Sequence, residues 1–249
     1  MAHGRTLFIS DLHLDAAAPG TTELFLAFLR TEALASDALY ILGDLFETWV
    51  GDDDEDPVRV RIRAGLRELT DTGVPCFIQH GNRDFLLGTD FMAASGCRLL
   101  PDPVVREFSG RRFVLSHGDA LCTRDHAYQR FRRLVRGTTF RKIWPRLPLA
   151  MRRGLASLAR RRSRAYTRRL PDSIMDVTPA AVTELLHATG GEVLVHGHTH
   201  RQHMHRVQML DGRSRTRIVL GDWHERGNAL AVYGDGRYEF LNVEAVNQT

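Results

Sequence analysis

The N-terminal half of the chain alternates short apolar runs with longer segments in which apolar residues recur at helical spacing. Four runs are apolar almost throughout and have strand length: residues 6–10, 38–42, 76–80 and 113–116. Residues 22–34 and 58–69 carry apolar side chains on one face of an expected helix. Strands that alternate with helices predict an α/β fold with a largely parallel sheet.

The pattern changes in the second half of the chain. Residues 124–170 contain apolar and aromatic residues at helical spacing and no strand signal. Strand patterns return later, at residues 192–196, 203–210, 216–220 and 229–233. These late strands have no helices between them, so we expect them to pair antiparallel. The pattern predicts an α/β core, formed by residues 1–123 and 171–249, that is interrupted by a helical cap at residues 124–170.

Charge distinguishes the expected cap from the core. The net charge of the 249 residues is only +4, but residues 124–169 hold 16 Arg and Lys against one acid, Asp125. This asymmetry favours contact with an anionic surface or substrate over a solvated helical face. Composition is otherwise that of a globular protein, and three cysteines without a CxxC motif favour a reducing cytosol. We see neither a signal peptide nor an apolar run long enough to span a membrane.

Polar side chains of a particular kind follow the expected strands. They are Asp11 and His13, then Asp44, then Asn82, then His117, and finally His198 and His200. Since strand ends of a parallel sheet meet at one edge, these side chains should converge. Their nitrogen and oxygen atoms suit Mn, Fe or Zn. Each motif alone is weak, because an Asp or Asn after Gly also marks a plain turn, but five such corners in order predict a metal site.

The motifs resemble the signature of the calcineurin-like metallophosphoesterases, which runs D-x-H, G-D, G-N-[HR]-[DE], H-G and G-H-x-H. Longer strings look most similar to one branch, the UDP-2,3-diacylglucosamine pyrophosphatases of lipid A synthesis in Gram-negative bacteria. The segments that carry this resemblance are residues 8–14, 38–47, 51–54, 80–88, 117–119, 174–177 and 196–201.

The resemblance implies a layered α/β/β/α core and two Mn²⁺ ions per chain. It implies two ligand groups that share Asp44: Asp11, His13, Asp44 and His200 around one ion, and Asp44, Asn82, His117 and His198 around the other. It gives catalytic contacts with the phosphates to Asn82, Arg83 and His198, and further substrate contacts to Asp125, Ser163 and Thr167. The family has Asn and Lys where this chain has Thr167 and Leu170, so that Arg168 or Arg169 would have to substitute.

The implied reaction is hydrolysis of the diphosphate of UDP-2,3-diacylglucosamine to UMP and 2,3-diacylglucosamine 1-phosphate. We accordingly expect a cytoplasmic monomer that is peripheral on the cytoplasmic face of the inner membrane and binds no nucleic acid. Arg83 supports a diphosphate independently. Arginine cannot donate its proton near neutral pH, but it can stabilise a phosphate that leaves as a good anion. The simpler alternative is that Arg83 only pairs with Asp84 or another acid.

The expected cap contains an amphipathic helix. Leu147, Met151, Leu155 and Leu158 form an apolar stripe, and the other faces carry Arg152, Arg153, Arg160, Arg161 and Arg162. This is the pattern of a basic helix that lies on a membrane surface. The stripe could equally pack on the core and leave the arginines in water.

Other functions remain open at this point. A basic arm could follow a nucleic-acid backbone in a metal-dependent nuclease, or the chain could be a non-enzymatic basic module that binds membranes. The acidic run at residues 52–56 is not a calcium loop, because an EF-hand needs Gly and Glu where this chain has Pro57 and Arg63. His224 and the other histidines that lack a partner at ligand spacing are expected to have structural or solvent roles.

Overall fold

The computed structural model describes residues 4–168, 170–224 and 226–244. The strands are β1 (Arg5–Ile9), β2 (Ala38–Leu42), β3 (Cys76–Gln79), β4 (Arg98–Leu100), β5 (Val104–Phe108), β6 (Arg111–Ser116), β7 (Val193–His196), β8 (His203–Gln208), β9 (Ser214–Val219), β10 (Gly227–Tyr233) and β11 (Tyr238–Val243). The helices are α1 (Pro19–Phe28), α2 (Pro57–Asp71), α3 (Thr89–Ser95), α4 (His126–Val135), α5 (Thr138–Ile143), α6 (Leu149–Thr167), α7 (Asp172–Met175) and α8 (Pro179–Thr189). Shorter turns are η1 (Leu29–Ala33), which is π-helical, and the 3₁₀ turns η2 (Asp119–Leu121) and η3 (Trp144–Arg146).

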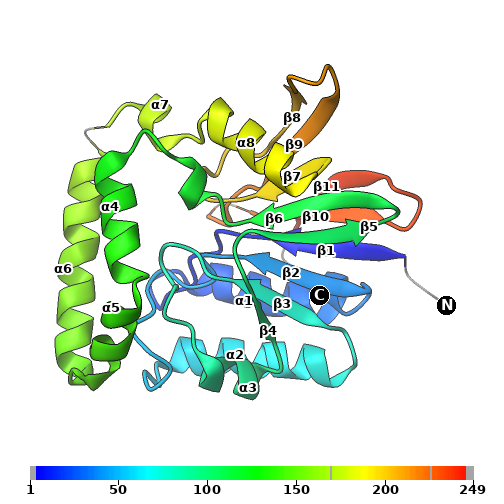
Figure 1. The fold of residues 1–249 in the computed structure, drawn as a ribbon. Helices are drawn as coiled ribbons and strands as arrows, with labels where there is room; N and C mark the ends of the chain where they lie inside the picture. Colours follow the sequence, from blue (N-terminus) through cyan, green and yellow to red (C-terminus); the bar gives the residue numbers. More distant parts are fainter. Residues whose placement is uncertain (1–3, 169, 225, 245–249) are drawn as a thin grey trace.

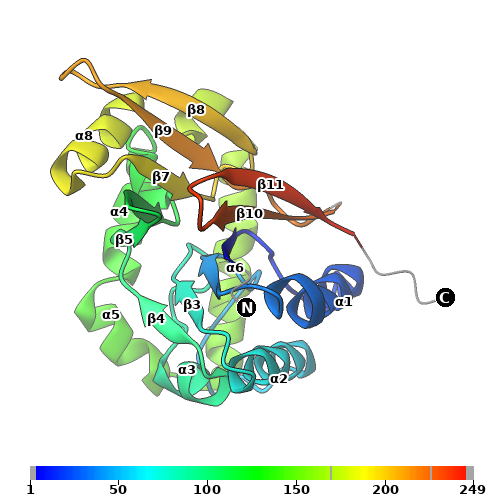
Figure 2. The ribbon, with the colours of Figure 1, turned by 90° about the vertical axis from the view of Figure 1, so that its right-hand side faces the viewer.

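Two stacked sheets form the middle of the molecule, and helices cover their outer faces (Figure 1). The strand order is β11-β10-β1-β2-β3-β4 in one sheet and β5-β6-β7-β9-β8 in the other. Helices α1 to α3 cover the first sheet, and α8 covers the second (Figure 2). The α/β/β/α layering expected from the sequence is confirmed.

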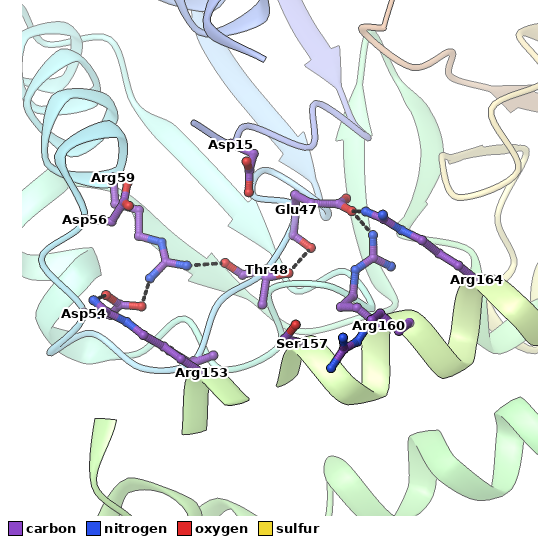
Figure 3. Close-up of a pocket in the computed structure, with 12 residues that line it drawn as sticks. Asp15, Glu47, Thr48, Asp54, Asp56, Arg59, Arg153, Ser157, Arg160 and Arg164 are labelled. Atoms are coloured by element: carbon purple, nitrogen blue, oxygen red, sulfur yellow. Dashed lines mark hydrogen bonds and ion pairs between the residues drawn. The ribbon is translucent and has the colours of Figure 1, made fainter. Parts of the chain in front are cut away.

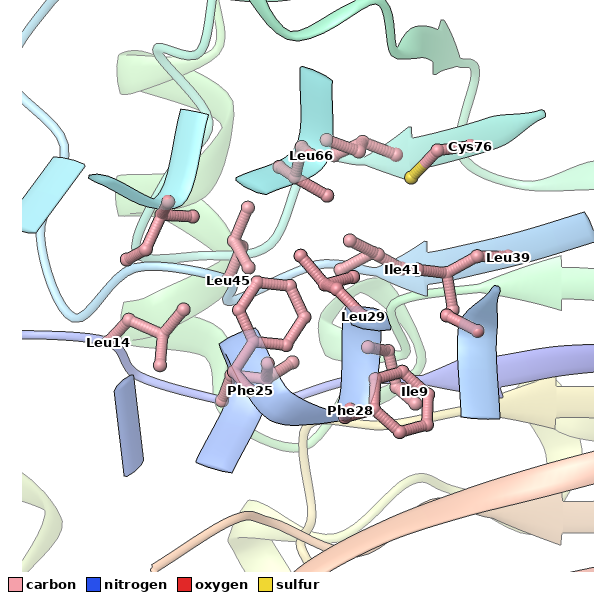
Figure 4. Packing of buried hydrophobic residues seen from close by; sticks show 14 of the residues in the cluster. Ile9, Leu14, Phe25, Phe28, Leu29, Leu39, Ile41, Leu45, Leu66 and Cys76 are labelled. Carbon is pink, nitrogen blue, oxygen red and sulfur yellow. The ribbon is translucent and has the colours of Figure 1, made fainter. Parts of the chain in front are cut away.

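The central strands are buried on both faces, which explains why they are apolar along their whole length. Leu39 and Ile41 of β2 face the helical layer, where they pack in one cluster with Phe25 (Figure 4). Tyr40 and Leu42 of the same strand belong to the cluster between the two sheets. A strand that is covered on both sides is apolar at every position. The apolar run at residues 38–42 therefore predicted the strand, and it matches β2 residue for residue.

The late strands depart from the expected pairing. β8 pairs antiparallel with β9, as predicted, but β9 runs parallel to β7. The expectation was wrong for this pair because β8 lies at the sheet edge, and the chain returns from it to place β9 beside β7. The pattern also missed β4, β5 and β11, whose residues are largely half-exposed or exposed and so lack a continuous apolar run.

The acidic run at residues 52–56 has structural roles. Asp52 accepts hydrogen bonds from the backbone N–H groups of Gly88, Asp90 and Phe91, where α3 begins. Asp56 caps α2 by accepting from the N–H of Val58 at 3.0 Å. Such caps satisfy N–H groups that have no partner inside the helix. Of the remaining acids, Asp53 and Asp54 pair with arginines of α6 and tie this helix to the loop, and Glu55 pairs with Arg63 of α2.

The helical segment 124–170 lies beside the ends of the two sheets (Figure 1). Its longest helix, α6, contacts the core through a polar face. Arg152 is only 2% exposed, and it donates to the carbonyl of Val50 at 2.8 Å and pairs with Asp53. The apolar stripe does not pack on the core: Met151, Leu155 and Leu158 are 52%, 45% and 39% exposed. Arg152 and Arg160 therefore turn toward the core. Arg153, Arg161 and Arg162 of the same helix are exposed like most of the stripe, of which only Leu147 is half-buried.

Replacing Arg152 by alanine is expected to destabilise the docking of α6. The change removes hydrogen bonds to the carbonyls of Val50 and Leu147 and the pair with Asp53. A loss of about 2 kcal/mol in unfolding free energy is expected, because the hydrogen bonds and the ion pair of a buried guanidinium are removed. Denaturant unfolding and limited proteolysis of α6 measure it. The exposed Arg162→Ala serves as the control, and equal stability of the two variants would contradict this role.

None of the helices within the described residues is both long enough and apolar enough to cross a membrane.

Candidate metal centre

The predicted ligands converge between the two sheets, and their backbones share an unusual conformation. Asp11 and Asp44 follow β1 and β2 of the six-stranded sheet, while His117 and His198 follow β6 and β7 of the other sheet. Within the described residues, six non-glycine residues have positive φ, and five are predicted ligands: Asp11 (55°), His13 (52°), Asp44 (52°), His198 (69°) and His200 (58°). Strained backbone of this kind persists only where the surrounding structure imposes it, and it concentrates at functional sites.

Two glycines let these segments approach closely. A Cβ atom at Gly81 would overlap the Asp44 carboxylate, and one at Gly197 would overlap the carboxylate of Asp11. The backbone of each motif thus packs against a predicted ligand from another strand, which fixes where that carboxylate lies.

Asp11, His13 and His200 form one group that could hold a cation. The Oδ2 atom of Asp11 accepts from Ser10 Oγ at 2.6 Å and from the N–H of His198 at 2.8 Å. Its Oδ1 atom is buried without a hydrogen-bond partner and lies 3.2 Å from His200 Nε2 and 4.0 Å from His13 Nε2. The two Nε2 atoms are 3.3 Å apart. A buried carboxylate oxygen that faces imidazole nitrogens fits a metal ion, which would supply the missing partner.

Asn82, His117 and His198 form a second convergence. His117 Nδ1 donates to the carbonyl of Leu42 at 2.9 Å, so its Nε2 atom carries a lone pair in the neutral ring. The Oδ1 atom of Asn82 lies 2.9 Å from that Nε2 atom and 2.9 Å from His198 Nδ1. The Asn82 amide therefore contacts both rings, and its oxygen could serve as a ligand to a cation held there. Without a cation, the amide turned by 180° would donate to both rings.

Asp44 lies between the two groups. Its Oδ2 atom is 3.9 Å from His13 Nε2, and its Oδ1 atom is 3.7 Å from His117 Nε2. One carboxylate thus faces both convergences, which is the arrangement that a bridging ligand needs. The imidazoles differ in protonation: burial opposes the charge on His200, but its contacts with the carboxylates of Asp11 and Asp222 raise its pKa to about 10. Burial and the charge of His117 lower the pKa of His198 to about 4, so this ring is neutral at pH 7.

Carboxylates behind the histidines were not identified from the sequence. His13 Nδ1 lies 3.2 Å from Glu47 Oε2, and His200 Nδ1 lies 3.1 Å from Asp222 Oδ2. A carboxylate in such a place can orient a ring and leave its Nε2 atom facing the site, although His13 Nδ1 lacks hydrogen-bond geometry toward Glu47. Both residues lie shortly after strands, in Asp44-Leu45-Phe46-Glu47 and Leu220-Gly221-Asp222, but so do many acids without such a role. Asp84 instead accepts the N–H groups of Leu45 and Gly81.

Arg83 pairs with another acid, Asp44, and not with Asp84. Its backbone N–H donates to Asp44 Oδ1 at 2.8 Å, and its Nε atom lies 3.7 Å from Asp44 Oδ2. The side chain is 25% exposed. The guanidinium therefore stands at the edge of the ligand groups with donors available to an anion.

The other predicted substrate contacts lie at the junction of α4 and α6. Asp125 is buried at the start of α4 and accepts a hydrogen bond from Tyr166 of α6 at 3.1 Å. Ser163 and Thr167 neighbour Tyr166 on α6, where Thr167 Oγ1 donates to the carbonyl of Ser163 at 3.1 Å. Arg168 is exposed and Leu170 is half-buried, whereas Arg169 lies outside the described residues.

Helix α4 is held against the second convergence by the buried Asp119. Asp119 accepts from Arg132 at 2.7 Å and from Arg136 at 3.2 Å, and also from the hydroxyl of Tyr128. The ring of Tyr128 stacks on His198 with 6.2 Å between centroids. Asp119 belongs to segment 117–119, one of those that carry the family resemblance. Its contacts with the arginines of α4 could be identified only from the tertiary structure.

Two cavities of about 500 Å³ and 400 Å³ lie between α6 and the core. Figure 3 shows the larger one, in which Arg160 and Arg164 point from α6 toward Glu47. The smaller one borders His13 and His200. His224 also lines it, and its ring lies parallel to that of His13 with 5.7 Å between centroids. The sequence alone gave His224 no role near the site.

The chain is similar to proteins of known family. Residues 4–202 match the model of the calcineurin-like phosphoesterases. The UDP-2,3-diacylglucosamine hydrolase of Serratia proteamaculans (strain 568) is 46% identical over 230 residues, which cover 92% of this chain and 95% of that protein. The protein of the same name from Stenotrophomonas maltophilia (strain R551-3) is 48% identical over 238 residues, which cover 93% of this chain and 96% of that protein. Vacuolar protein sorting 29 from Cryptosporidium parvum, a solved structure, is 14% identical with a TM-score of 0.47, and covers 96% of this chain and 95% of its own.

Proposed function

Since this chain belongs to the calcineurin-like phosphoesterase family, we propose that it is a hydrolase that cleaves the diphosphate of UDP-2,3-diacylglucosamine in lipid A synthesis. The products are UMP and 2,3-diacylglucosamine 1-phosphate. The observation that carries this proposal is the convergence of the His, Asp and Asn side chains of the five motifs, with Arg83 beside them, in a chain matched by hydrolases of that name over more than nine tenths of its length. The experiment is incubation of the purified chain with Mn²⁺ and UDP-2,3-diacylglucosamine, followed by detection of UMP.

Two Mn²⁺ ions per chain are part of the proposal. Asp11, His13, Asp44 and His200 would hold one, and Asp44, Asn82, His117 and His198 the other. The buried, unpartnered Oδ1 atom of Asp11 and the convergence of Asn82, His117 and His198 support this assignment. Bound divalent ions would lower the pKa of a water molecule and neutralise charge on the phosphates.

The side chains around the ligand groups have distinct tasks toward the diphosphate. Arg83 is placed to stabilise negative charge on the departing phosphate, and it cannot act as a general acid because it keeps its proton. Asn82 and His198 border the same space and would orient the phosphates. Since 2,3-diacylglucosamine 1-phosphate leaves as a phosphate anion, no protonation of the leaving oxygen is required.

Glu47 and Asp222 are proposed to position His13 and His200. Glu47→Gln and Asp222→Asn are each expected to weaken Mn²⁺ binding about 10- to 100-fold, the usual effect of removing a carboxylate behind a ligating histidine. Titration calorimetry with Mn²⁺ measures this directly, without reference to turnover. Glu23→Gln, which changes a surface pair with Arg61, is the matched control. Unchanged Mn²⁺ affinity in both variants would remove the positioning role.

The division into a core at residues 1–123 and 171–249 and a cap at 124–170 is also proposed. The cap would lie peripherally on the cytoplasmic face of the inner membrane. Three observations support this: the exposed stripe of Met151, Leu155 and Leu158, the excess of arginines, and the exposed Leu134 of α4. Apolar surface reaches the acyl layer, while arginines contribute roughly 1 kcal/mol each near an anionic leaflet. We propose a monomer in this role.

The double change Leu155→Asp and Leu158→Asp is expected to weaken binding to vesicles that contain anionic lipid and to raise KM for the diacyl substrate. Both side chains are exposed, so the fold should tolerate the change. Hydrolysis of a small soluble phosphodiester should persist, because other segments supply the ligand groups. Leu210→Asp, at an exposed leucine outside the cap, is the control. If vesicle binding and KM do not change, the cap does not engage lipid.

Two alternative functions give different results in the same assays. A metal-dependent nuclease would hydrolyse DNA or RNA with a steep dependence on salt, and a non-enzymatic membrane-binding module would show no turnover with Mn²⁺. We expect neither result, because the apolar side chains exposed on the cap suit lipid and Asp11, His13 and His200 offer ligand atoms to one cation.

A further inference from the structure

The smaller cavity, of about 400 Å³, opens on one side of the ligand groups. Its lining includes His13 and His200 but neither His117 nor His198. Asp125, Ser163 and Thr167 do not line it either. It is therefore separate from the α4–α6 junction to which the sequence assigned the sugar contacts.

Three arginines against the two carboxylates of Asp15 and Glu47 give the lining of the cavity a net positive charge. Arg83, Arg160 and Arg164 all line it. Arg160 pairs with Glu47 through one terminal nitrogen, while its Nε and Nη1 atoms are buried without a hydrogen-bond partner. Buried guanidinium donors without acceptors are rare in native structures, and an oxyanion of planar or tetrahedral geometry is their natural partner.

The remaining walls suit a compact, polar group rather than acyl chains. The apolar part of the lining is small, with Leu12, Ala17 and Ala18, and the rest is polar: Thr21, His224 and the carboxylates of Asp15 and Glu47. The exposed imidazole of His224 offers a flat ring on which a heterocyclic base can stack. The volume falls within the range of about 300–1,000 Å³ for pockets that hold small molecules.

We propose that this cavity is the subsite for the nucleoside 5′-monophosphate half of the substrate, with its phosphate toward His13, His200 and the arginines and its base toward His224. The acylated sugar would then extend from the other side of the ligand groups, along the α4–α6 junction. This assignment rests on the proposed function, because it names the site of one half of that substrate.

The test uses the two reaction products as probes of the two halves. Hydrolysis of UDP-2,3-diacylglucosamine by the full chain with Mn²⁺ is measured in the presence of UMP or of 2,3-diacylglucosamine 1-phosphate. Calorimetry measures UMP binding separately. Ala17→Trp fills the cavity from its exposed rim, and the adjacent exposed Ala16→Trp, which does not line the cavity, is the matched control.

Ala17→Trp is expected to weaken UMP binding and UMP inhibition at least about tenfold, a difference of about 1.4 kcal/mol, while inhibition by the lipid product changes less than threefold. His224→Ala should weaken UMP binding in the same direction, and provides a second test if the tryptophan disturbs the fold. If inhibition by the lipid product is lost instead, the acylated sugar and not the nucleotide binds in the cavity. Unchanged UMP binding in both variants would overturn the proposal. If the unsubstituted chain releases no UMP from the substrate, the proposed function itself has failed.

Discussion

Replacing Asp44 by asparagine is expected to lower kcat by three orders of magnitude or more, corresponding to about 4 kcal/mol of transition-state stabilisation. Its two carboxylate oxygens face different ligand groups, at 3.9 Å from His13 Nε2 and 3.7 Å from His117 Nε2. An amide has one oxygen acceptor and no charge, so it cannot serve two cations. The variant should therefore also bind fewer than two Mn²⁺ per chain.

Metal analysis of the dialysed protein and steady-state kinetics measure the two consequences separately. Asp90→Asn, at an exposed aspartate in the first turn of α3, controls for loss of one negative charge. The backbone N–H of Arg83 donates to Asp44, so a thermal melt is needed to show that the variant remains folded. Two full equivalents of Mn²⁺ together with a near-normal rate would rule out a bridging role for Asp44.

Arg83→Ala is expected to lower kcat on UDP-2,3-diacylglucosamine about 100- to 1,000-fold, the usual cost of removing one donor to developing negative charge. KM should change less, because the charge develops on the leaving phosphate in the transition state. Arg63→Ala, at a surface arginine that pairs with Glu55, is the control.

Substrates with different leaving groups test whether Arg83 acts by stabilising the departing phosphate. Arg83→His places a side chain that can donate a proton where arginine cannot. Relative to Arg83→Ala, it should restore hydrolysis of phosphoesters with poor alkoxide leaving groups more than hydrolysis of the diphosphate. An Arg83→Ala variant that hydrolyses the diphosphate at the normal rate would show that the leaving-group argument is wrong.

The burial of each strand decided whether it could be predicted from the sequence. β2 was predicted to the residue because both of its faces are covered, by the helical layer at Leu39 and by the second sheet at Tyr40. β11 was missed because its exposed and half-buried residues alternate without a strong apolar signal. The parallel pairing of β9 with β7 was also missed, because pairing direction depends on the path of the chain around β8 and not on the local pattern.

The sequence by itself determined the chemistry available at the strand ends. The residue types of Asp44, Asn82 and Arg83 define which atoms can bind a metal, donate a hydrogen bond or carry charge. Only the tertiary structure decided which side chains support them. Glu47 stands 3.2 Å from His13 Nδ1 although 34 positions separate them, and no local pattern reports such a contact. The same holds for α6. Its periodicity defines an apolar face and a basic face but not which of them meets the core. That choice was made by the carbonyl of Val50 and the carboxylate of Asp53, polar groups that a buried arginine can satisfy and a leucine cannot.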